Sequence, residues 1–361
     1  THTERAKERV LRFMKDITIK PDITIRQAMK ALDKTAEKCL LLVDEHKKLL
    51  GTLTDGDLRR CILAGAQFSE DISVCYTTEP IILKQNEYSK ADAKQLLREH
   101  KLDLIPVVDK NHMVVDYVTW LAMNSDSKKD KSLENIPVVI MAGGKGTRLE
   151  PFTKILPKSL VPVHEKPIIE HIIERFTELG CSDFHLTVNY KGKILKAYFE
   201  ELQPDYQVHF VEEQEPLGTA GSLRFLEGQF NQPFFVTNCD IIIKADYGSL
   251  YEFHQKGGYD ITLVASAKEY VIPYGTCELN DDGHLSHINE KPHYDFLINT
   301  GLYVLNPNVL KLIPEKKFYH ITHLIEDAKN QEKKVGVFPI DDDAWVDIGQ
   351  WVEYQKAVDQ L

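Results

Sequence analysis

The chain has 361 residues, of which 43% are hydrophobic, and a formal net charge of −11 at pH 7. This length predicts about two or three domains. The acidic balance argues against nucleic acid or an anionic membrane as a partner, because both bind clustered Lys and Arg. The six cysteines lie far apart and form no C-x-x-C pair, so their spacing predicts neither a zinc site nor a disulfide framework.

The first 16 residues are rich in charged side chains and predict a short helix, not a signal peptide. Unpaired cysteines also fit a reducing compartment. We therefore expect a cytoplasmic protein that has no membrane partner.

Residues 10–65 and 74–123 form an internal repeat with an offset of 65 residues, so that Val43-Asp44 aligns with Val108-Asp109. Each copy reads as a helix, a short apolar strand, a tight turn, a second strand and another helix. Two such similar units predict a pseudo-symmetric pair.

The first copy contains LLGTLTDGDLRR at residues 49–60, which resembles the strand-to-helix segment of CBS domains. These domains occur as tandem pairs and often bind adenine nucleotides. The resemblance implies a regulatory nucleotide site formed by Thr54, Asp57, Arg59 and Arg60. The alternative is that Thr54 and Asp57 only cap the following helix.

The second copy departs from this pattern, because Ala122 aligns with Asp57 and Asp116 aligns with Gly51. We expect it to have lost its ligand pocket. Residues 124–134 are polar and charged, as in an exposed linker. The predicted organisation is a tandem CBS pair at 1–123, a linker at 124–134 and a second domain at 135–361.

After the linker, apolar runs alternate with helical stretches. Strands are predicted at 137–142, 183–190, 206–213, 234–243 and 260–266, and helices near 167–178, 191–202, 219–227 and 248–256. This rhythm predicts an α/β fold with a Rossmann-like, mainly parallel sheet. Ligands of such sheets bind beyond the carboxyl ends of the strands.

AGGKGTRLEPFTKILPKSLVPV, residues 142–163, follows the first of these strands. Its glycines let the backbone approach a triphosphate and turn N–H groups toward the phosphates. Four cations, Lys145, Arg148, Lys154 and Lys158, face one carboxylate, Glu150. The P-loop pattern, G-x-x-x-x-G-K-[ST], is absent from this segment. The dinucleotide-binding pattern G-x-G-x-x-G does not fit either, because Leu149 stands where its third glycine belongs.

The segment resembles the signature of sugar-1-phosphate nucleotidylyltransferases, G-G-x-G-T-R-L-x-P-x-T-x-x-x-P-K-x-x-x-P-V, from Gly143 to Val163. Further family elements follow in order: EPLGTAG (215–221), NCD (238–240), YGT (274–276), NEKP (289–292), NTGLYVL (299–305) and WVDIG (345–349). The resemblance spans residues 136 to about 358 and implies a nucleotide-sugar biosynthetic transferase.

The resemblance also implies a role for each matching residue. Arg148, Lys158 and Lys291 are the catalytic cations, which grip the leaving phosphates, the α-phosphate and the sugar phosphate. Asp240 and Asp347 are ligands for Mg²⁺. The nucleotide-binding residues are Gly143, Gly144, Gly146, Thr147, Glu213, Gly218 and Thr219, and the sugar-phosphate-binding residues are Gly275, Glu290, Asn299 and Thr300. Taken singly, Asp240 and Asp347 are equally explained as a helix cap and a turn residue.

Base and sugar are less defined. Glu213 falls near the base-binding position, and a carboxylate matches the N1–H and N2–H donors of guanine, so GTP is favoured over UTP, dTTP or CTP. A CBS pair ahead of such a domain resembles the glucosamine-1-phosphate guanylyltransferases of legionaminic acid biosynthesis. That resemblance implies glucosamine 1-phosphate, with mannose or heptose phosphates as alternatives.

A second class of function is a nucleotide-sensing protein with an inactive catalytic domain. Both metal carboxylates and the cationic residues are present, which favours the enzyme. We expect NTP and a sugar 1-phosphate as substrates and a homo-oligomer in which the CBS pair regulates or assembles the enzyme.

Overall fold

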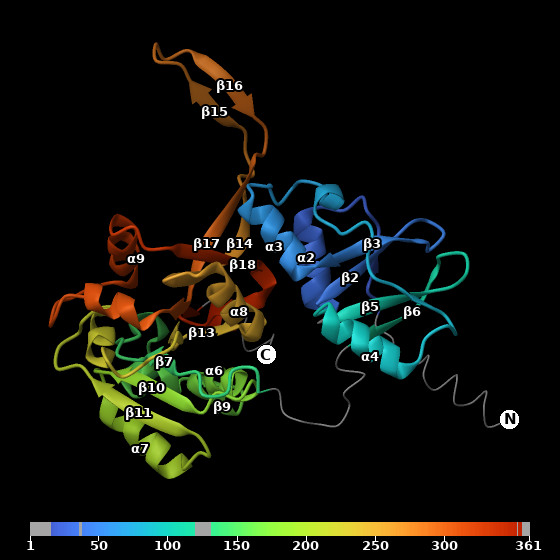
Figure 1. Ribbon diagram of the computed structural model, residues 1–361. Coiled ribbons are helices and arrows are strands. Elements are labelled where there is room, and N and C mark those ends of the chain that lie inside the picture. The colour runs from blue at the N-terminus through green and yellow to red at the C-terminus, as the bar shows by residue number, and fades with distance from the viewer. Residues whose placement is uncertain (1–15, 36–37, 120–130, 352, 356–361) are drawn as a thin grey trace. The chain divides into compact units, whose positions relative to one another are not determined.

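The computed structural model describes residues 16–35, 38–119, 131–351 and 353–355 (Figure 1). Backbone contacts divide the chain into two compact units, residues 1–127 and 128–361. The short helix expected at residues 1–16 falls almost wholly outside the described residues, as do Ala122 and much of the expected linker. No helix of the described segments combines the length and the apolar character that crossing a membrane requires.

The first unit contains two three-stranded sheets with the same strand arrangement. In each, a short first strand is parallel to the second, and the second is antiparallel to the third. The first sheet consists of β1 (Thr18–Ile19), β2 (Cys39–Val43) and β3 (Leu49–Thr54), with helices α2 (Ile25–Thr35) and α3 (Asp55–Leu63); the second consists of β4 (Leu83–Lys84), β5 (Leu104–Val108) and β6 (Val114–Thr119), with helix α4 (Lys90–Glu99).

The tight turns of the two copies are built in the same way. Asp44 Oδ1 accepts hydrogen bonds from the backbone N–H groups of His46 and Lys48, at 2.8 and 2.9 Å. Asp109 Oδ1 accepts the equivalent pair from Asn111 and Met113, also at 2.8 and 2.9 Å. An Asp at this position closes the turn by bonding to the backbone that follows it. The repeat in the sequence is therefore a repeat in local structure.

The two turns also join the copies to each other. Leu49 N donates to His112 O, and Val114 N donates to Lys47 O, both at 3.0 Å. Each bond is the counterpart of the other under the 65-residue offset. Two copies that exchange equivalent contacts are related by two-fold symmetry. Here the two copies are the repeats of the first unit.

The second unit is built on a seven-stranded sheet. In spatial order its strands are β11 (Gln207–Glu212), β10 (Asp183–Val188), β7 (Val138–Met141), β12 (Phe234–Asn238), β17 (His293–Leu305), β14 (Ile261–Val271) and β18 (Val335–Asp341). All neighbours are parallel except β17, which runs antiparallel to both β12 and β14. The predicted fold class of this unit, an α/β fold with a mainly parallel sheet, is confirmed.

Both faces of this sheet are covered. Alternate strand residues face two cores: Val138 and Ile140 pack on one side, and Val139 on the other. Helices α6 (Ile168–Thr177), α7 (Gly192–Leu202) and α8 (Tyr247–Gly257) cover the first face. Helix α9 (Ile321–Asn330) and the 3₁₀ segments η6 (Gly221–Leu226) and η7 (Pro307–Leu312) cover the second. The sheet is therefore the middle layer of a three-layer sandwich.

Two local predictions differ from the structure. The helix expected near 219–227 is the 3₁₀ segment η6, because residues 217–221 are tied by backbone bonds to Tyr319 and cannot wind regularly. The strand expected at 234–243 is broken after Asn238. Its second part, β13 (Ile241–Ile243), leaves the sheet and pairs with β19 (Trp345–Asp347).

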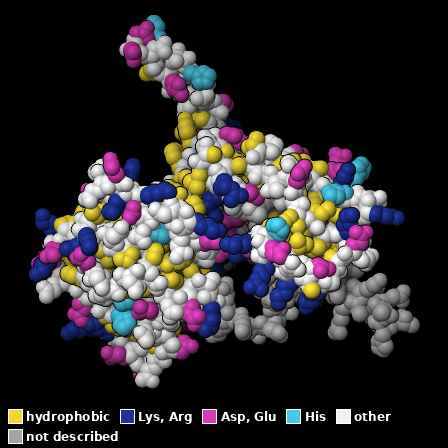
Figure 2. All heavy atoms as spheres, viewed as in Figure 1, with side chains coloured by type: hydrophobic (Ala, Val, Ile, Leu, Met, Phe, Trp, Pro, Cys, Tyr) yellow, Lys and Arg dark blue, Asp and Glu magenta, His cyan; other side chains and the backbone are white. Residues whose placement is uncertain are grey.

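Strands β14 and β17 extend beyond the sheet as a two-stranded ribbon that leads to a hairpin, β15 (Thr276–Leu279) and β16 (Leu285–Asn289). Figure 2 shows hydrophobic side chains gathered on this ribbon. Exposed large residues there include Tyr270, Val271, Tyr294, Phe296 and Leu297. The remaining short elements are β8 (Pro162–Val163), β9 (Lys166–Pro167), η2 (Ile72–Val74), η3 (Thr147–Leu149), η4 (Phe152–Lys154), η5 (Lys158–Leu160) and η8 (Asp342–Ala344).

Candidate active site

The glycine loop leaves the carboxyl end of β7, in the centre of the sheet. Gly146 has φ +66°, and a Cβ there would lie 2.9 Å from both Lys158 Cβ and Thr153 Cγ2. Thr153 Oγ1 donates to Gly146 O at 2.9 Å, which folds the loop back on itself. Among the described residues, none beyond its two chain neighbours has an atom within 4 Å of a Cβ built on Gly144, so there is open space beside its backbone. Only glycine fits the turn at residue 146.

Lys158 is the cation that the structure brings deepest into the site. Its Nζ contacts Asp240 Oδ2, and the two side chains are only 18% and 15% exposed. Burial lowers the pKa of Lys158, but the Asp240 charge and hydrogen bond outweigh it, so the net pKa lies above its usual value. The ammonium group is therefore charged at neutral pH.

The other cations of the loop differ from one another. Lys154 Nζ lies 3.4 Å from Glu150 Oε2, so that lysine is paired within the loop. Arg148 and Lys145 are exposed, as is Thr147 at the start of η3. Lys145, Arg148 and Lys154 all face solvent, and of these three Lys154 lies beside the single carboxylate, Glu150.

Asp240 and Asp347 are brought together by the pairing of β13 with β19. Ile241 is opposite Asp347 in this antiparallel pair, and Ile348 N donates to Asp240 O at 2.8 Å. Both carboxylates converge on Gly349: a Cβ there would lie 2.2 Å from Asp240 Oδ2 and 3.0 Å from Asp347 Oδ1. Only a residue without a side chain allows this convergence.

The charge of Asp347 is poorly accommodated by the protein alone. Burial raises the pKa of Asp347, and the neighbouring Asp240 carboxylate raises it further, while the N–H of Gly349 and Lys158 oppose the shift. Two converging carboxylates whose charge is not fully compensated are a suitable ligand set for a hard divalent cation. The residues present therefore fit Mg²⁺.

Glu213 lies beside the glycine loop and is buried. A Cβ on Gly143 would lie 2.9 Å from Glu213 Oε1, and Glu213 Oε2 accepts a hydrogen bond of 3.2 Å from Leu217 N. The carboxylate thus connects the first glycine with the loop of residues 215–218. The sequence predicts its position near the nucleotide but not this second contact.

Residues 217–221 are fixed against the segment before α9. Gly218 has φ +81°, and a Cβ there would lie 2.7 Å from Tyr319 O. Tyr319 O accepts from Ala220 N and Gly221 N, and Tyr319 N donates to Leu217 O. Thr219 Oγ1 accepts from Ile321 N at 3.0 Å, so in this structure it caps α9. Its contact with a nucleotide stays a prediction.

Some residues near the carboxyl ends of the strands are not part of any matched motif. Asn189 Nδ2 donates to Glu213 O at 2.8 Å, and Lys191 Nζ donates to Thr153 O at 2.9 Å. Both follow the end of β10 and hold the loops on either side of it. The signal for them is the polar sequence NYKGK directly after an apolar strand, at the edge where ligands bind.

The residues predicted for the sugar phosphate fall into two groups. Asn299 and Thr300 lie on β17 within the sheet. Thr300 is buried and its Oγ1 donates to Val264 O at 2.9 Å, so its hydroxyl serves the pairing of β17 with β14. Asn299 is exposed, and its side chain bonds Tyr303 Oη and Gly301 N.

Gly275, Glu290 and Lys291 lie instead at the base of the projecting hairpin, beyond the pair formed by Val271 and His293. Asn299 follows His293 by six positions, which corresponds to about 20 Å along the ribbon at a strand rise of ~3.3 Å per residue. In this structure the three residues do not join Asn299 at the sheet edge.

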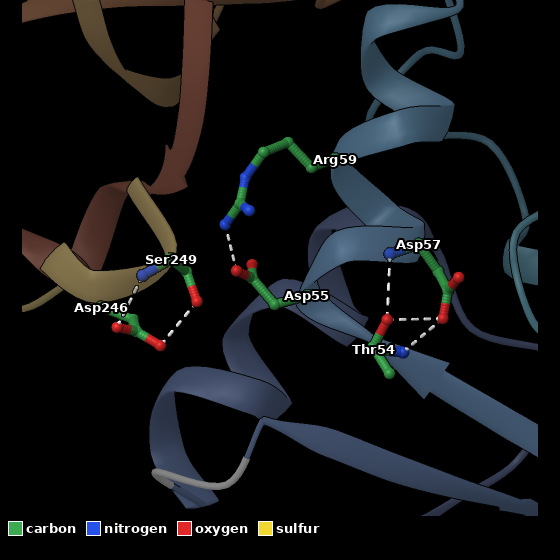
Figure 3. Close-up of polar contacts among 6 residues, drawn as sticks. All are labelled: Thr54, Asp55, Asp57, Arg59, Asp246 and Ser249. Atoms are coloured by element: carbon green, nitrogen blue, oxygen red, sulfur yellow. Dashed lines mark hydrogen bonds and ion pairs between the residues drawn. The ribbon is translucent and has the colours of Figure 1, made fainter. Parts of the chain in front are cut away.

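In the first unit, Thr54 and Asp57 form a capping box at the start of α3 (Figure 3). Thr54 Oγ1 accepts from Asp57 N at 3.1 Å, and Asp57 Oδ2 accepts from Thr54 N at 2.8 Å. Asp57 also pairs with Arg60, and Asp55 with Arg59. The structure thus shows the capping contacts, and nucleotide binding at this corner stays a prediction.

Comparison with known proteins gives two family matches: the nucleotidyl transferase model matches residues 137–361, and the CBS domain model matches residues 10–64. A mannose-1-phosphate guanyltransferase of Pichia angusta is 37% identical over 222 residues, which cover 59% of this chain and 60% of that protein. One of Saccharomyces cerevisiae is 36% identical over 222 residues, covering 59% and 61%. The chain spans about three fifths of the length of these curated relatives.

Two solved structures share the fold of the second unit. HddC from Yersinia pseudotuberculosis matches with a TM-score of 0.50 and 27% identity, over 62% of this chain and 99% of that one. A putative glucose-1-phosphate thymidylyltransferase from Bacillus anthracis matches with a TM-score of 0.50 and 21% identity, over 62% and 94%, which supports the fold alone.

Proposed function

Because the chain belongs to the nucleotidyl transferase family, we propose that it transfers a guanylyl group from GTP to a sugar 1-phosphate and releases pyrophosphate. The observation that carries this proposal is the meeting of Lys158, Asp240 and Asp347 beside the glycine loop. A buried cation next to two converging carboxylates suits a reaction between two polyanions, where positioning and charge neutralisation do most of the work.

The residues of the site contact different parts of the two substrates. The backbone of Gly143, Gly144 and Gly146 faces the phosphates, and the exposed Arg148 reaches the leaving pyrophosphate. Lys158 exchanges its contact with Asp240 for the α-phosphate as the nucleotide binds, which keeps its ammonium group paired. The attacking oxygen is already ionised on the sugar phosphate, so no side chain has to take up a proton.

Asp240 and Asp347 would hold Mg²⁺, which when bound neutralises phosphate oxygens. Without the ion, the two carboxylates repel each other and the incoming nucleotide. Lys158 partly offsets that repulsion, because it contacts Asp240.

We assign the choice of base to Glu213. It is buried beside Gly143, so an unpaired carboxylate there is costly. Guanine offers two adjacent N–H donors to it, whereas uracil and thymine offer one, N3–H, flanked by two carbonyl oxygens. The relatives that are named mannose-1-phosphate guanyltransferases support the same base.

Two acceptor sugars are supported by different observations. The CBS domain at residues 10–64 supports glucosamine 1-phosphate through the resemblance to guanylyltransferases of legionaminic acid biosynthesis. The names of the relatives support mannose 1-phosphate. We propose glucosamine 1-phosphate as the acceptor and mannose 1-phosphate as the alternative.

The test is to incubate the full chain with Mg²⁺, each NTP and a panel of sugar 1-phosphates, and to measure pyrophosphate release. We expect a preference for GTP of more than about tenfold over UTP or dTTP, since one lost hydrogen bond to a charged group costs about 1.5–3 kcal/mol. Transfer from GTP to mannose 1-phosphate but not glucosamine 1-phosphate would correct the acceptor only. No pyrophosphate with any pair would favour the inactive, nucleotide-sensing alternative.

Glu213→Gln isolates the base choice, because it keeps one acceptor for Leu217 N and removes the charge. The preference for GTP should shrink by about 1–3 kcal/mol. Glu212→Gln is the matched control: the neighbouring Glu212 is exposed and pairs with Lys196, so the NTP ratios should not change. Equal ratios in wild type and Glu213→Gln would refute the role of Glu213 and leave the transferase itself intact.

A further inference from the structure

Asp183, His185 and His209 form a cluster at the amino ends of β10 and β11, the end opposite to the glycine loop. Asp183 is the first residue of β10, and His185 follows two positions later, so both side chains lie on the same face of the sheet. His209 on β11 is the registered partner of His185. Parallel pairing therefore places the three side chains together.

The distances match the geometry of a metal site. His185 Nε2 and His209 Nε2 lie 3.2 and 3.3 Å from Asp183 Oδ1, and one ligand atom from each residue lies within 4.8 Å of the others. Zinc bonds of about 2.0–2.1 Å place neighbouring ligands of a tetrahedral site about 3.3–3.4 Å apart. Two of the three ligand separations already have this value.

Two of the ligand atoms are buried, and their close polar contacts lie within the cluster itself. His185 is 7% exposed; among the described residues its Nε2 makes no well-aligned hydrogen bond, and its near polar neighbour is Asp183 Oδ1 at 3.2 Å, which also lies 3.3 Å from His209 Nε2. A bound cation would satisfy both atoms at once. Phe230 packs edge-on against the His185 ring and closes the inner side of the cluster.

Access to the cluster is also suitable. The side chains of His209 and Asp183 are 52% and 35% exposed, which leaves an entry path and room for a water as a fourth ligand.

We propose that Asp183, His185 and His209 bind a divalent first-row transition ion, Zn²⁺ in particular, between β10 and the edge strand β11. Two imidazoles and one carboxylate favour zinc over Mg²⁺, which prefers oxygen ligands alone. The ion joins two adjacent strands at the end remote from the nucleotide. The same strands lead to Asn189 and Glu213 at the opposite edge, so the ion fixes the strand pair that carries them.

The test is calorimetric titration of the full, metal-stripped chain with ZnCl₂, in excess Mg²⁺ so that the Asp240 and Asp347 carboxylates are occupied. We expect one zinc per chain and a rise in thermal stability. His209→Ala and Asp183→Asn should each weaken zinc binding at least about tenfold, because each removes one of only three protein ligands. His284→Ala, which alters an imidazole that is 80% exposed on the hairpin, should bind zinc as the wild type does.

Co²⁺ supplies a second measurement. His209→Cys keeps a metal-binding side chain, so its Co²⁺ form should gain a thiolate-to-cobalt absorption band that the wild type lacks. A thiolate band in the wild type would mean that cysteines take the ion, and the proposal would fail. Zinc binding that is unchanged in His209→Ala, or absent from the wild type, would overturn it as well.

Discussion

Asp240 and Asp347 converge on Gly349, and their charges are opposed by one nearby lysine, Lys158. Removing either carboxylate removes half of the proposed ligand set for Mg²⁺. Asp240→Asn and Asp347→Asn should each lower turnover by about 10²-fold or more, as expected when a charge-stabilising group is lost. Pyrophosphate release measures turnover, and circular dichroism checks the fold. Asp281→Asn, the same change on the exposed hairpin, is the control, and near-wild-type turnover in either site variant would refute the metal role.

Asp347 also has a consequence for stability. Its pKa is raised in the folded protein by burial first and by Asp240 as well, so ionising it costs folding free energy. This cost is absent at low pH, where Asp347 is protonated in both states, and it grows as the pH rises past the ordinary carboxyl value toward the raised one. Above the raised pKa the full cost remains.

Asp347→Asn should therefore unfold at a higher temperature than the wild type at pH 7.5 in EDTA, because Asn keeps an acceptor for Gly349 N without the charge. The difference should shrink toward pH 4, near the ordinary carboxyl pKa of about 4. Adding Mg²⁺ should stabilise the wild type more than the variant. A wild type that is the more stable protein at pH 7.5 in EDTA would show that the charge is compensated.

At the scale of elements, the loop of residues 217–221 depends on its close approach to Tyr319, in the segment before α9. Gly218→Ala places a methyl group 2.7 Å from Tyr319 O at φ +81°, which should cost about 1–3 kcal/mol of unfolding free energy. Urea unfolding measures this. Gly228→Ala is the matched control: its φ is +79°, but no atom lies within 4 Å of the added Cβ. If both variants lose the same unfolding free energy, the contact with the Tyr319 carbonyl costs nothing beyond the backbone strain.

The elements show how far sequence reasoning reaches. Strand β7 and helices α6, α7 and α8 are predicted within a few residues, because their apolar periodicity is local. Residues Gly143 to Lys158 are likewise contiguous in the chain. The break after Asn238 is not predicted, because only pairing with β19 explains it, and that partner lies about a hundred residues away.

The same limit applies to single residues. Asn189 and Lys191 act through loops far from them in sequence. His185 and His209 become a pair only through the parallel register of β10 and β11, which no spacing in the sequence reveals. The absence of C-x-x-C pairs argues only against a cysteine-based zinc site. It does not test a site formed by histidines on two strands.

At the scale of the whole molecule, the first unit supplies the regulatory hypothesis. If a nucleotide binds at Thr54, Asp57 and the adjacent arginines, Asp57→Ala should weaken its binding to the full chain by about tenfold, since a hydrogen bond to a charged group contributes about 1.5–3 kcal/mol. Calorimetry with AMP, ATP and GTP measures this, using Asp240→Asn as the background so that the catalytic site contributes less.

Asp92→Ala is the matched control for that prediction. Asp92 forms the same capping box, with Ser89, at the start of α4, but without an adjacent arginine pair. Both variants lose a cap, so a shared drop in thermal stability is expected. A loss of nucleotide binding in Asp57→Ala alone supports the pocket, and equal binding in both variants contradicts it.

The reciprocal bonds between the turns at Lys47 and His112 bear on how the two copies can diverge. Two halves joined in one chain meet at an effective concentration of about millimolar, whereas separate halves at micromolar levels would meet about a thousandfold less often. The covalent connection between the two copies therefore favours their association, and the surface between them needs little affinity of its own. This connection thus lets the corner residues of one copy change, as with Asp116 in place of a glycine, while the pair still holds together.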